Sequence, residues 1–407
     1  MIGPNAVHYA GFGLAGALMI AGSIQAAEKE KNVPGFYPDI GIMVNFDDNI
    51  RREENNEDED WYTRINPKLN WVAMFGRHRL DVNAELDIWE YAKENDENAF
   101  DRYLLSELEL DVSSTLDVNL AAGYSYSHTI RGQDPNAATK DPNEWESWGA
   151  SGEVIYGRRT NKMQAALLLD HQQIDFLNNG LEGRDHDQNM IKGSLFYNLG
   201  PKTQLVAEVI RTDFDYERVY APIVPAGDAK LDSTDMAYRV GINWEATAKT
   251  SGKFRIGRSE KDMDDSRLTD FSGLTTDLNL VWKPKSYSTV DVLLSRSTQE
   301  TKQSSTSHVV KNQFTVEWKH DLTALARLEA SGTLENDKWS EIREDDLFDA
   351  RLGLRYKLRR WMDVVVSYAF QTRDSNIVGL DYDSNSLMFM LEIYRQETKR
   401  AKRSLSP

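Results

Sequence analysis

Cysteine is absent from this chain of 407 residues. Its absence excludes disulfide bonds, thiolate nucleophiles and cysteine-bound zinc. Long apolar runs are also missing, because beyond the N-terminal region no segment approaches the roughly 20 apolar residues of a membrane-spanning helix. The hydrophobic fraction is 40%, and the mean hydropathy is -0.58. A helical membrane protein is therefore excluded. A transmembrane β-barrel is compatible with these values, because only every second strand residue of a barrel faces lipid.

Basic residues are too few to balance the acidic ones: 48 Lys and Arg stand against 65 Asp and Glu, which gives a formal net charge of -17. Nucleic-acid binding depends on basic surface, so we expect no nucleic-acid partner. The linear motifs of serine hydrolases, zinc proteases and P-loop enzymes are absent as well. The sequence therefore predicts no enzyme and no cofactor. An outer-membrane hydrolase that assembles Ser, His and Asp from separate strands stays open as the third-ranked alternative.

Residues 349–372 contain the unit that the rest of the chain repeats. Leu352, Leu354 and Tyr356 alternate with Arg351 and Arg355, so one face of the segment is apolar and the other is charged. After a break at residues 359–360 the alternation resumes on a second arm. Each arm is about 9 to 12 residues long, the length that a strand tilted by about 45° needs to cross the bilayer core. The unit is therefore predicted to be a transmembrane β-hairpin.

The two-strand unit recurs along nearly the whole chain, which predicts a single domain. Short connections alternate with long polar ones, as at the periplasmic and extracellular rims of an outer-membrane barrel. The long connections are expected at residues 48–60, 131–143, 216–233, 261–270 and 336–346. The strands are expected at residues 39–47, 61–75, 77–91, 101–113, 116–130, 144–157, 163–175, 186–199, 203–215, 233–246, 251–260, 271–283, 288–298, 306–320, 324–336, 346–358, 361–373 and 384–395.

The predicted fold is all-β: a closed transmembrane antiparallel up-and-down β-barrel of about 18 strands that occupies residues 27–395. Residues 1–26 read as a signal peptide, because an apolar segment precedes a small-residue cleavage site. Residues 396–407 are expected to form a basic periplasmic tail. A β-propeller fits less well, because its blades need four short strands each, whereas each repeat here holds two long ones. These features predict a location in the outer membrane of a Gram-negative bacterium.

An apolar-x-aromatic step precedes most of the short turns. Tyr and Trp at the same end of alternate strands are expected to form an interfacial belt, because an amphipathic ring is best accommodated at headgroup level. Cross-strand packing in a soluble sheet is the alternative explanation. The predicted belt residues are Trp71, Tyr156, Tyr197, Trp244, Trp282, Trp318 and Tyr356.

The polar face of each strand is expected to line the lumen. Barrels of 16 to 18 strands are too wide to be filled by their own side chains, so they leave room for an aqueous channel. The early wall is mostly acidic, and the later wall, whose polar face also includes Arg239, is mixed. Opposite charges on neighbouring strands are expected to pair. The alternative is that these charges only solvate and cross-link the wall. The predicted lumen-lining residues are Asp81, Glu85, Asp87, Glu107, Glu109, Lys311, Arg327, Glu329, Arg351 and Arg355.

Two other features leave alternatives open. In the last strand, either Phe389 and Leu391 or Met388 and Met390 face lipid. Acidic stretches at residues 53–60 and 262–265 have the oxygen ligands that Ca²⁺ or Mg²⁺ requires, but neither has the spacing of an EF-hand. We expect solvated loops there and no metal site.

Several short motifs occur in the first four strands. They are Asp47-Asp48-Asn49-Ile50, Ile65-Asn66-Pro67-Lys68-Leu69, Gly76-Arg77-His78-Arg79-Leu80, and Glu94-Asn95-Asp96 before Phe100-Asp101-Arg102-Tyr103. With these motifs the chain resembles, over about residues 36–395, the β-barrel porin family whose members accompany capsule and exopolysaccharide assembly. No catalytic residue is implied by the resemblance.

The resemblance implies an outer-membrane channel that exports a capsular polysaccharide or exopolysaccharide. Its expected partners are the polysaccharide, outer-membrane lipid, and periplasmic polysaccharide export and copolymerase proteins. The residues alone support a channel, for which a general diffusion porin or solute uptake channel is the alternative. The basic tail and two arginine pairs, at residues 158–159 and 359–360, lie on the predicted periplasmic rim and favour export, although anchoring near lipid headgroups would explain them equally well.

Overall fold

The computed structural model describes residues 34–394 except 56, 132–140, 219, 225–226, 248, 301–305 and 341. The expected signal peptide and basic tail lie outside the described residues. Two short 3₁₀ helices, η2 (Asn95–Glu97) and η3 (Glu182–Arg184), accompany the strands. The strands are β1 (Gly35–Asp47), β2 (Asp60–Phe75), β3 (His78–Tyr91), β4 (Ala99–Asp111), β5 (Leu116–His128), β6 (Glu144–Tyr156), β7 (Met163–Phe176), β8 (His186–Gly200), β9 (Thr203–Tyr216), β10 (Tyr220–Val224), β11 (Gly227–Ala229), β12 (Ser233–Thr247), β13 (Thr250–Met263), β14 (Phe271–Lys285), β15 (Ser288–Gln299), β16 (Val309–Asp321), β17 (Ala326–Trp339), β18 (Arg343–Arg359), β19 (Met362–Ser375) and β20 (Tyr382–Tyr394).

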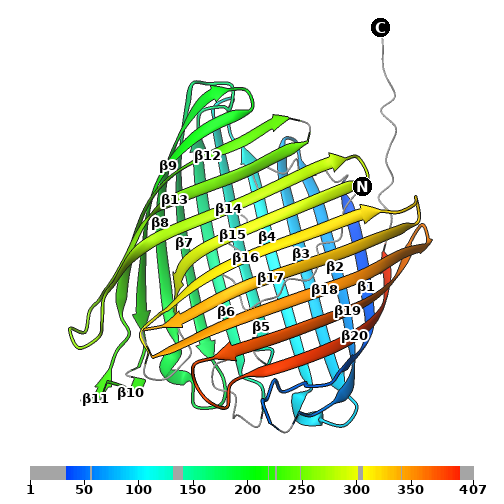
Figure 1. Cartoon of the computed structure of the whole chain (residues 1–407). Coiled ribbons are helices and arrows are strands. Elements are labelled where there is room, and N and C mark those ends of the chain that lie inside the picture. Colours follow the sequence, from blue (N-terminus) through cyan, green and yellow to red (C-terminus); the bar gives the residue numbers. More distant parts are fainter. Residues whose placement is uncertain are drawn as a thin grey trace.

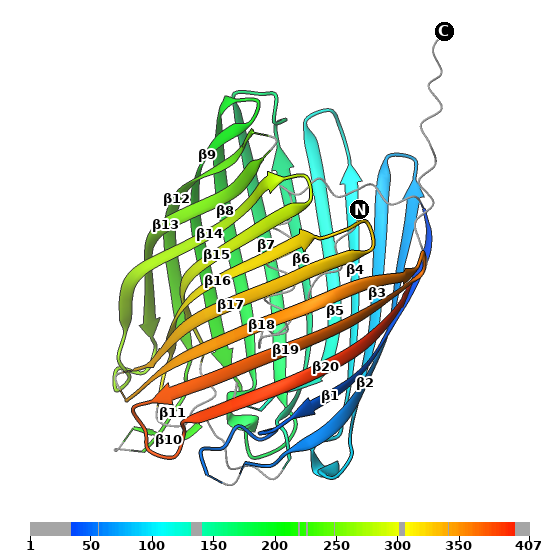
Figure 2. The ribbon, with the colours of Figure 1, turned by 45° about the vertical axis from the view of Figure 1, so that its right-hand side comes forward.

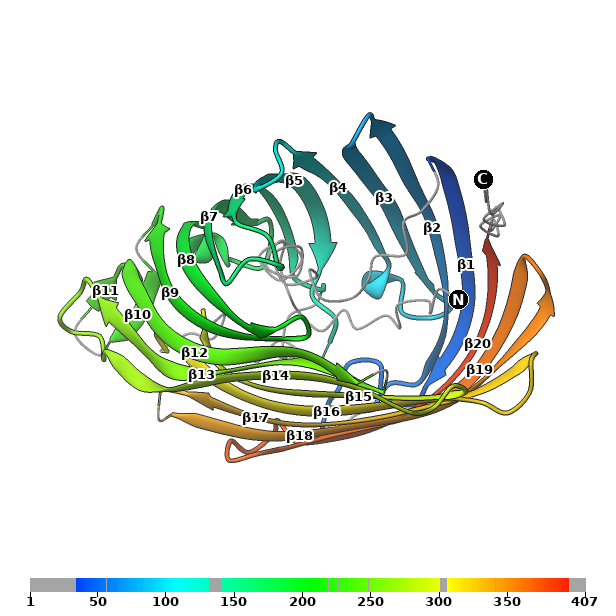
Figure 3. The same cartoon turned by 90° about the horizontal axis from the view of Figure 1, so that it is seen from above.

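Eighteen of these strands form one antiparallel sheet that closes on itself (Figure 1). Strands adjacent in the chain pair with each other, β9 pairs with β12 across the β10–β11 hairpin, and β1 closes the ring by pairing with β20. Viewed from above, the strands form one continuous wall that is flatter along β12–β19 than along β2–β9 (Figure 3). The predicted closed up-and-down barrel of 18 strands is confirmed. The β10–β11 hairpin lies inside the long connection that was expected at residues 216–233.

Burial distinguishes the two faces of the barrel wall. In β1, Phe36 and Val44 are exposed, whereas Met43, Asn45 and Asp47 are buried. The wall is a single sheet, and no described segment packs on its outside, so a buried strand side chain lies on the concave face. Strand alternation then assigns the intervening residues to the convex face. The same alternation of exposed apolar and buried polar residues continues around the ring.

Register resolves the orientation of the last strand. Phe389 lies opposite the exposed Val44, and Met390 lies opposite the buried Met43. Phe389 and Leu391 therefore share the convex face, and Met388 and Met390 lie on the concave face.

Turn lengths differ between the two ends of the barrel, as expected. Short turns connect the strands at one end, where β1 begins and β20 ends, and the longer connections lie at the other end (Figure 2). The expectation of a long loop at residues 336–346 is wrong, because β17 continues to Trp339 and β18 already begins at Arg343. Polar pairs extend the ladder there: Lys338 Nζ lies 2.7 Å from Glu344 Oε1, so polarity in this segment marks paired strand ends rather than a loop.

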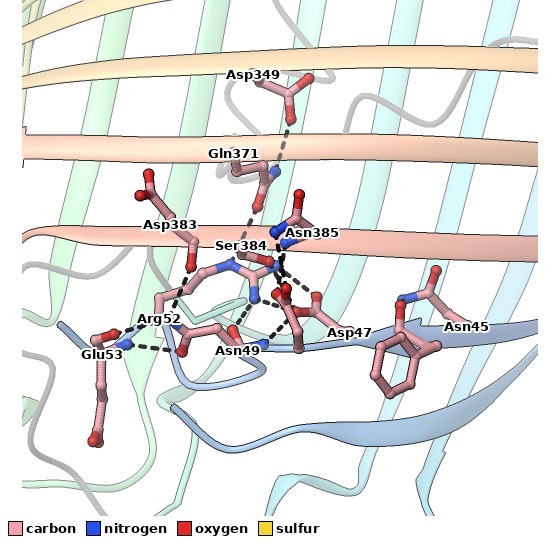
Figure 4. Close-up of polar contacts among 12 residues, drawn as sticks. Asn45, Asp47, Asn49, Arg52, Glu53, Asp349, Gln371, Asp383, Ser384 and Asn385 are labelled. Atoms are coloured by element: carbon pink, nitrogen blue, oxygen red, sulfur yellow. Dashed lines mark hydrogen bonds and ion pairs between the residues drawn. The ribbon is translucent and has the colours of Figure 1, made fainter. Parts of the chain in front are cut away.

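The β1–β20 closure is held at the long-loop end by a polar clasp, which we define as Asp47, Asn49, Arg52, Gln371 and Ser384 (Figure 4). The Arg52 guanidinium pairs with Asp47 at 2.8 Å and donates through Nε to Gln371 Oε1 at 3.2 Å. Ser384 Oγ donates to Asp47 Oδ1 at 2.9 Å. Burial lowers the pKa of Arg52, but the Asp47 carboxylate outweighs it and raises that pKa overall. The clasp therefore joins the first loop of the chain to its last two strands.

Substitution Arg52→Ala should destabilise the barrel. Asp47 is buried, and it would lose its charged partner, which costs roughly 3 kcal/mol of unfolding free energy for a buried ion pair. The expected result is a lower temperature for the gel shift between folded and unfolded forms in SDS, together with a lower unfolding free energy in urea. Lys93→Ala is the control, because Lys93 and its partner Glu59 are both exposed and the change there should be within about 0.5 kcal/mol. Equal effects of the two substitutions would contradict the role of the clasp.

Asp185, which lies between η3 and β8, is a buried carboxylate in the loops. Burial raises its pKa to about 6, and the hydrogen bond that it accepts from the Phe176 backbone N–H, at 2.7 Å, only partly offsets this effect. A raised pKa means that the folded state favours the protonated form. The stabilising contribution is therefore complete at low pH and is lost as the pH rises through about 6.

Substitution Asp185→Asn should remove this pH dependence, because the amide cannot ionise and still offers an acceptor to Phe176. Unfolding temperatures of both proteins should be measured between pH 4 and pH 8. They should converge near pH 4, and the unfolding temperature of the variant should increasingly exceed that of the wild type as the pH rises. Asp265→Asn is the control: Arg267 holds the pKa of this exposed carboxyl at about 2, so its titration lies below the range measured. Parallel curves for the wild type and Asp185→Asn would contradict the assignment.

Candidate functional site

The concave face carries most of the charged side chains of the strands, and their cross-strand spacing brings opposite charges together. On the early wall, Arg64 Nε donates to Asp87 Oδ1 at 2.6 Å, and Lys68 Nζ lies 3.1 Å from Glu85 Oε1. Asp81, which is buried, receives a hydrogen bond of 2.8 Å from Arg79 Nη2. Register places two further predicted residues, Glu107 and Glu109, opposite Asp81 and Arg79.

On the late wall the predicted residues also meet partners of opposite charge. Lys311 Nζ lies 2.6 Å from Glu335 Oε1, and Arg327 Nε lies 2.6 Å from Asp321 Oδ1. Arg355 pairs with Glu329 at 3.0 Å and also contacts Glu392 and Asp363.

Arg351 forms no ion pair among the described residues, and register places it opposite Ser331 and Ala369. All ten predicted residues thus share the face on which buried side chains lie. Their role in lining a path for a solute stays a prediction.

The predicted belt residues all lie on the convex face, within a few positions of the short turns. Tyr156, Trp282 and Tyr356 are 65%, 48% and 45% exposed, and Tyr197 and Trp318 are exposed as well. Trp71 stacks on Phe36 of the neighbouring strand, with ring centroids 5.8 Å apart, so cross-strand packing and exposure at one rim coexist. Contact of the belt with lipid headgroups stays a prediction.

A cationic cluster on β8, β9, β12 and β13 was only partly found from the sequence. We define it as Lys192, Arg239, Lys253 and Arg255 around Glu208. The carboxylate of Glu208, which is buried, lies 2.9 Å from Arg239 Nη2, 3.1 Å from Arg255 Nε and 3.7 Å from Lys192 Nζ. Arg239 was assigned to the polar face, but the others were missed, because they lie on three other strands and meet it only through cross-strand register. Each occupies the polar phase of its own strand, and that alternation is the signal that could have found them.

A second charged network fixes a long connection to the wall. Lys261, which is fully buried, lies 3.2 Å from Asp235 Oδ1 and forms a close ion pair with Glu300. Tyr216 donates its hydroxyl hydrogen to the same Glu300 carboxylate. Burial alone would raise the pKa of Glu300, but the positive charge of Lys261 lowers it overall. The connection that follows β15 is therefore anchored by charge on the concave side of β9 and β13.

A polar pocket of about 380 Å³ lies at the long-loop end. His128, Glu144 and Asp96 are among its lining residues, and His128 Nδ1 lies 2.9 Å from Asp101 Oδ1. No serine, threonine or lysine lines the part of this pocket that the structure describes, so it offers a histidine and carboxylates but no hydroxyl or amine nucleophile. Among the described residues there is also no group of three or more His, Asp or Glu side chains arranged to hold a metal ion. No helix within the described ranges is long and apolar enough to cross a membrane.

Solved structures with a similar fold are outer-membrane proteins of low sequence identity. The outer membrane protein OpdK of Pseudomonas aeruginosa is 9% identical with a TM-score of 0.49, over 89% of this chain and 99% of OpdK. The siderophore receptor PirA of the same species is 9% identical with a TM-score of 0.44, over 89% of this chain and 81% of PirA. A search of curated proteins found no match.

A family profile covers nearly the whole barrel. The profile described as "Putative beta-barrel porin 2" matches residues 35–395, from the first residue of β1 to just beyond β20. The match confirms the expected porin family and the expected outer-membrane location, whereas the connection to capsule or exopolysaccharide stays a prediction. The chain therefore belongs to the "Putative beta-barrel porin 2" family and is an outer-membrane β-barrel porin of a Gram-negative bacterium.

Proposed function

We propose that this porin conducts a capsular polysaccharide or exopolysaccharide chain outward through the barrel lumen. The observation that supports this function is the pairing of charges over the concave face, as in Arg64–Asp87 and Arg355–Glu329. Paired charges offer many hydrogen-bonding groups of both kinds but few strong single sites. A hydrated sugar chain can exchange such contacts step by step without being held at one point.

The outward direction and the cargo come from the resemblance to porins that accompany capsule and exopolysaccharide assembly. Arginines at the short-turn rim add a docking surface for a periplasmic export or copolymerase protein. Arg159 is already engaged with Glu245 at 2.8 Å. Arg359 and Arg360 form no ion pair among the described residues, so they are the better candidates. In this proposal the short-turn rim faces the periplasm, the long loops face the cell exterior, and no covalent chemistry takes place.

A general porin or uptake channel is the second candidate, and the mixed polar wall would also admit small polar solutes. The family description, which names a porin and no cargo, supports this alternative. The difference between the two candidates lies in direction and cargo, and both require the concave face to border water.

Water at the concave face can be tested with two cysteines that are neighbours in β18. Arg351→Cys places a thiol on the concave face, and Leu352→Cys places one at the same depth on the convex face, where Leu352 is 54% exposed. The chain has no native cysteine, so there is no background reaction. In intact outer membranes, a charged thiol reagent should modify position 351 quickly and position 352 at least roughly tenfold more slowly, because lipid excludes the reagent. Equal rates, or the reverse order, would contradict the assignment of the faces.

Deletion of the gene tests cargo and direction. We expect loss of surface polysaccharide and accumulation of the same polymer behind the outer membrane, with both restored by the wild-type gene. The uptake alternative predicts unchanged surface polymer and slower growth on a particular small solute. That outcome would overturn the export proposal.

A further inference from the structure

We infer that the cationic cluster on β8, β9, β12 and β13 is a binding site for a carboxylate group carried by the solute that passes through the lumen. The inference extends the proposed function, because it assigns an anionic chemistry to the cargo. It goes beyond the mixed polar wall described above, since it identifies one place on that wall where positive charge is in excess.

The charge balance of the cluster is the first argument. Four cations, Lys192, Arg239, Lys253 and Arg255, share three nearby carboxylates, those of Glu153, Glu208 and Asp277. Glu208 contacts three of the cations, and one positive charge is in excess. The chain as a whole carries a net charge of -17, so this local excess of positive charge runs against its overall composition. Elsewhere on the described concave face, Lys311 and Arg355 each contact two or more carboxylates, and Arg64 and Lys68 each pair with one of their own.

Incomplete hydrogen bonding is the second argument. The Nε–H of Arg239 is buried and has no acceptor among the described residues, and Glu208 Oε2, 2.9 Å from Arg239 Nη2, is likewise buried without a well-aligned hydrogen bond. Lys253 forms no ion pair there either, and register places it between Asn243 and Asn279, which are neutral. A buried donor without an acceptor is unfavourable, and a carboxylate is the acceptor that would satisfy both a guanidinium and an ammonium group.

Two glycines let β12 and β13 approach closely at the cluster. Register places Gly241 opposite Arg255 and Gly257 opposite Arg239. A Cβ on Gly241 would lie 1.9 Å from the Phe254 carbonyl oxygen and 2.8 Å from Arg255 Cδ, and a Cβ on Gly257 would lie 1.9 Å from the Tyr238 carbonyl oxygen. Gly241 therefore also leaves space for the Arg255 side chain, which reaches the Glu208 carboxylate.

The site lies at mid-height of the wall, because Glu208, Arg239 and Lys192 occur near the middle of their strands. The acidic β3–β4 wall, which bears Asp81 and Glu107, lies on the other side of the ring (Figure 3). An anionic group in the lumen would be repelled by one wall and attracted to the other, so its path would follow the cluster.

Direct binding to the full chain in detergent tests the site without requiring transport. The probe is trigalacturonate, with neutral maltotriose as the uncharged sugar and inorganic phosphate as the free anion, each measured by calorimetry at low salt. We expect trigalacturonate to bind and maltotriose not to bind. In the variant Arg239→Gln/Lys253→Gln, the Kd for trigalacturonate should rise about tenfold or more, as expected for the loss of charged hydrogen bonds.

Lys319→Gln is the matched control. It also removes a positive charge from the concave face, but Lys319 is already paired: its Nζ lies 3.0 Å from Glu317 Oε2 and 3.9 Å from Asp291 Oδ2. The control should leave the Kd within about twofold, and gel-shift temperatures in SDS should show that every variant is folded. Equal weakening by Lys319→Gln, no effect of the Arg239 and Lys253 substitutions, or binding of phosphate without trigalacturonate would each overturn the inference. The deletion phenotype is independent, so failure of the export proposal and failure of this site can be distinguished.

Discussion

Pairing of β1 with β20 is the constraint on which the rest of the barrel depends. An open sheet of this size would leave two rows of backbone donors and acceptors without partners, which lipid cannot supply. Closure occurs through nine residue pairs, from Asp39–Tyr394 to Asp47–Ser386, which is shorter than the ladder between β17 and β18. Asp48 and Asn385 extend this short seam through backbone and side-chain hydrogen bonds.

Closure also determines the chemistry of the concave face. Charged side chains on the inside of the ring are shielded from lipid and lie close to one another. They therefore pair across strands, as Lys68 does with Glu85 and Lys311 with Glu335. Where the pairing is incomplete, as around Arg239 and Lys253, the wall retains charge with which a solute can interact. The ratio of cations to carboxylates on a few adjacent strands thus determines whether that part of the wall is electrically balanced or retains charge that a solute can contact.

Much of this architecture could be predicted from alternation alone. Strands such as residues 349–358 and 361–373 have a strict two-residue period, so their faces and the short turn between them were identified correctly. Polar strand ends were misread at residues 336–346, because paired charges beyond the apolar span have the composition of a loop. The cationic cluster was mostly missed for a different reason: Lys192, Glu208 and Arg255 lie on separate strands and meet only through cross-strand register, which a single strand does not encode. Contacts made by loops, such as Glu300 with Lys261, depend on three-dimensional folding that local periodicity does not describe.

The polar clasp has a consequence for how the ends of the chain find each other. Asp47 can meet both Arg52 and Ser384 only when β1 and β20 are in the observed register. A slip of one residue would turn Asp47 to the convex face, and a slip of two would separate it from Ser384 by about 7 Å. The clasp therefore favours the observed register over alignments slipped by one or two residues, because the slipped seams would lack the contact between Asp47 and Ser384.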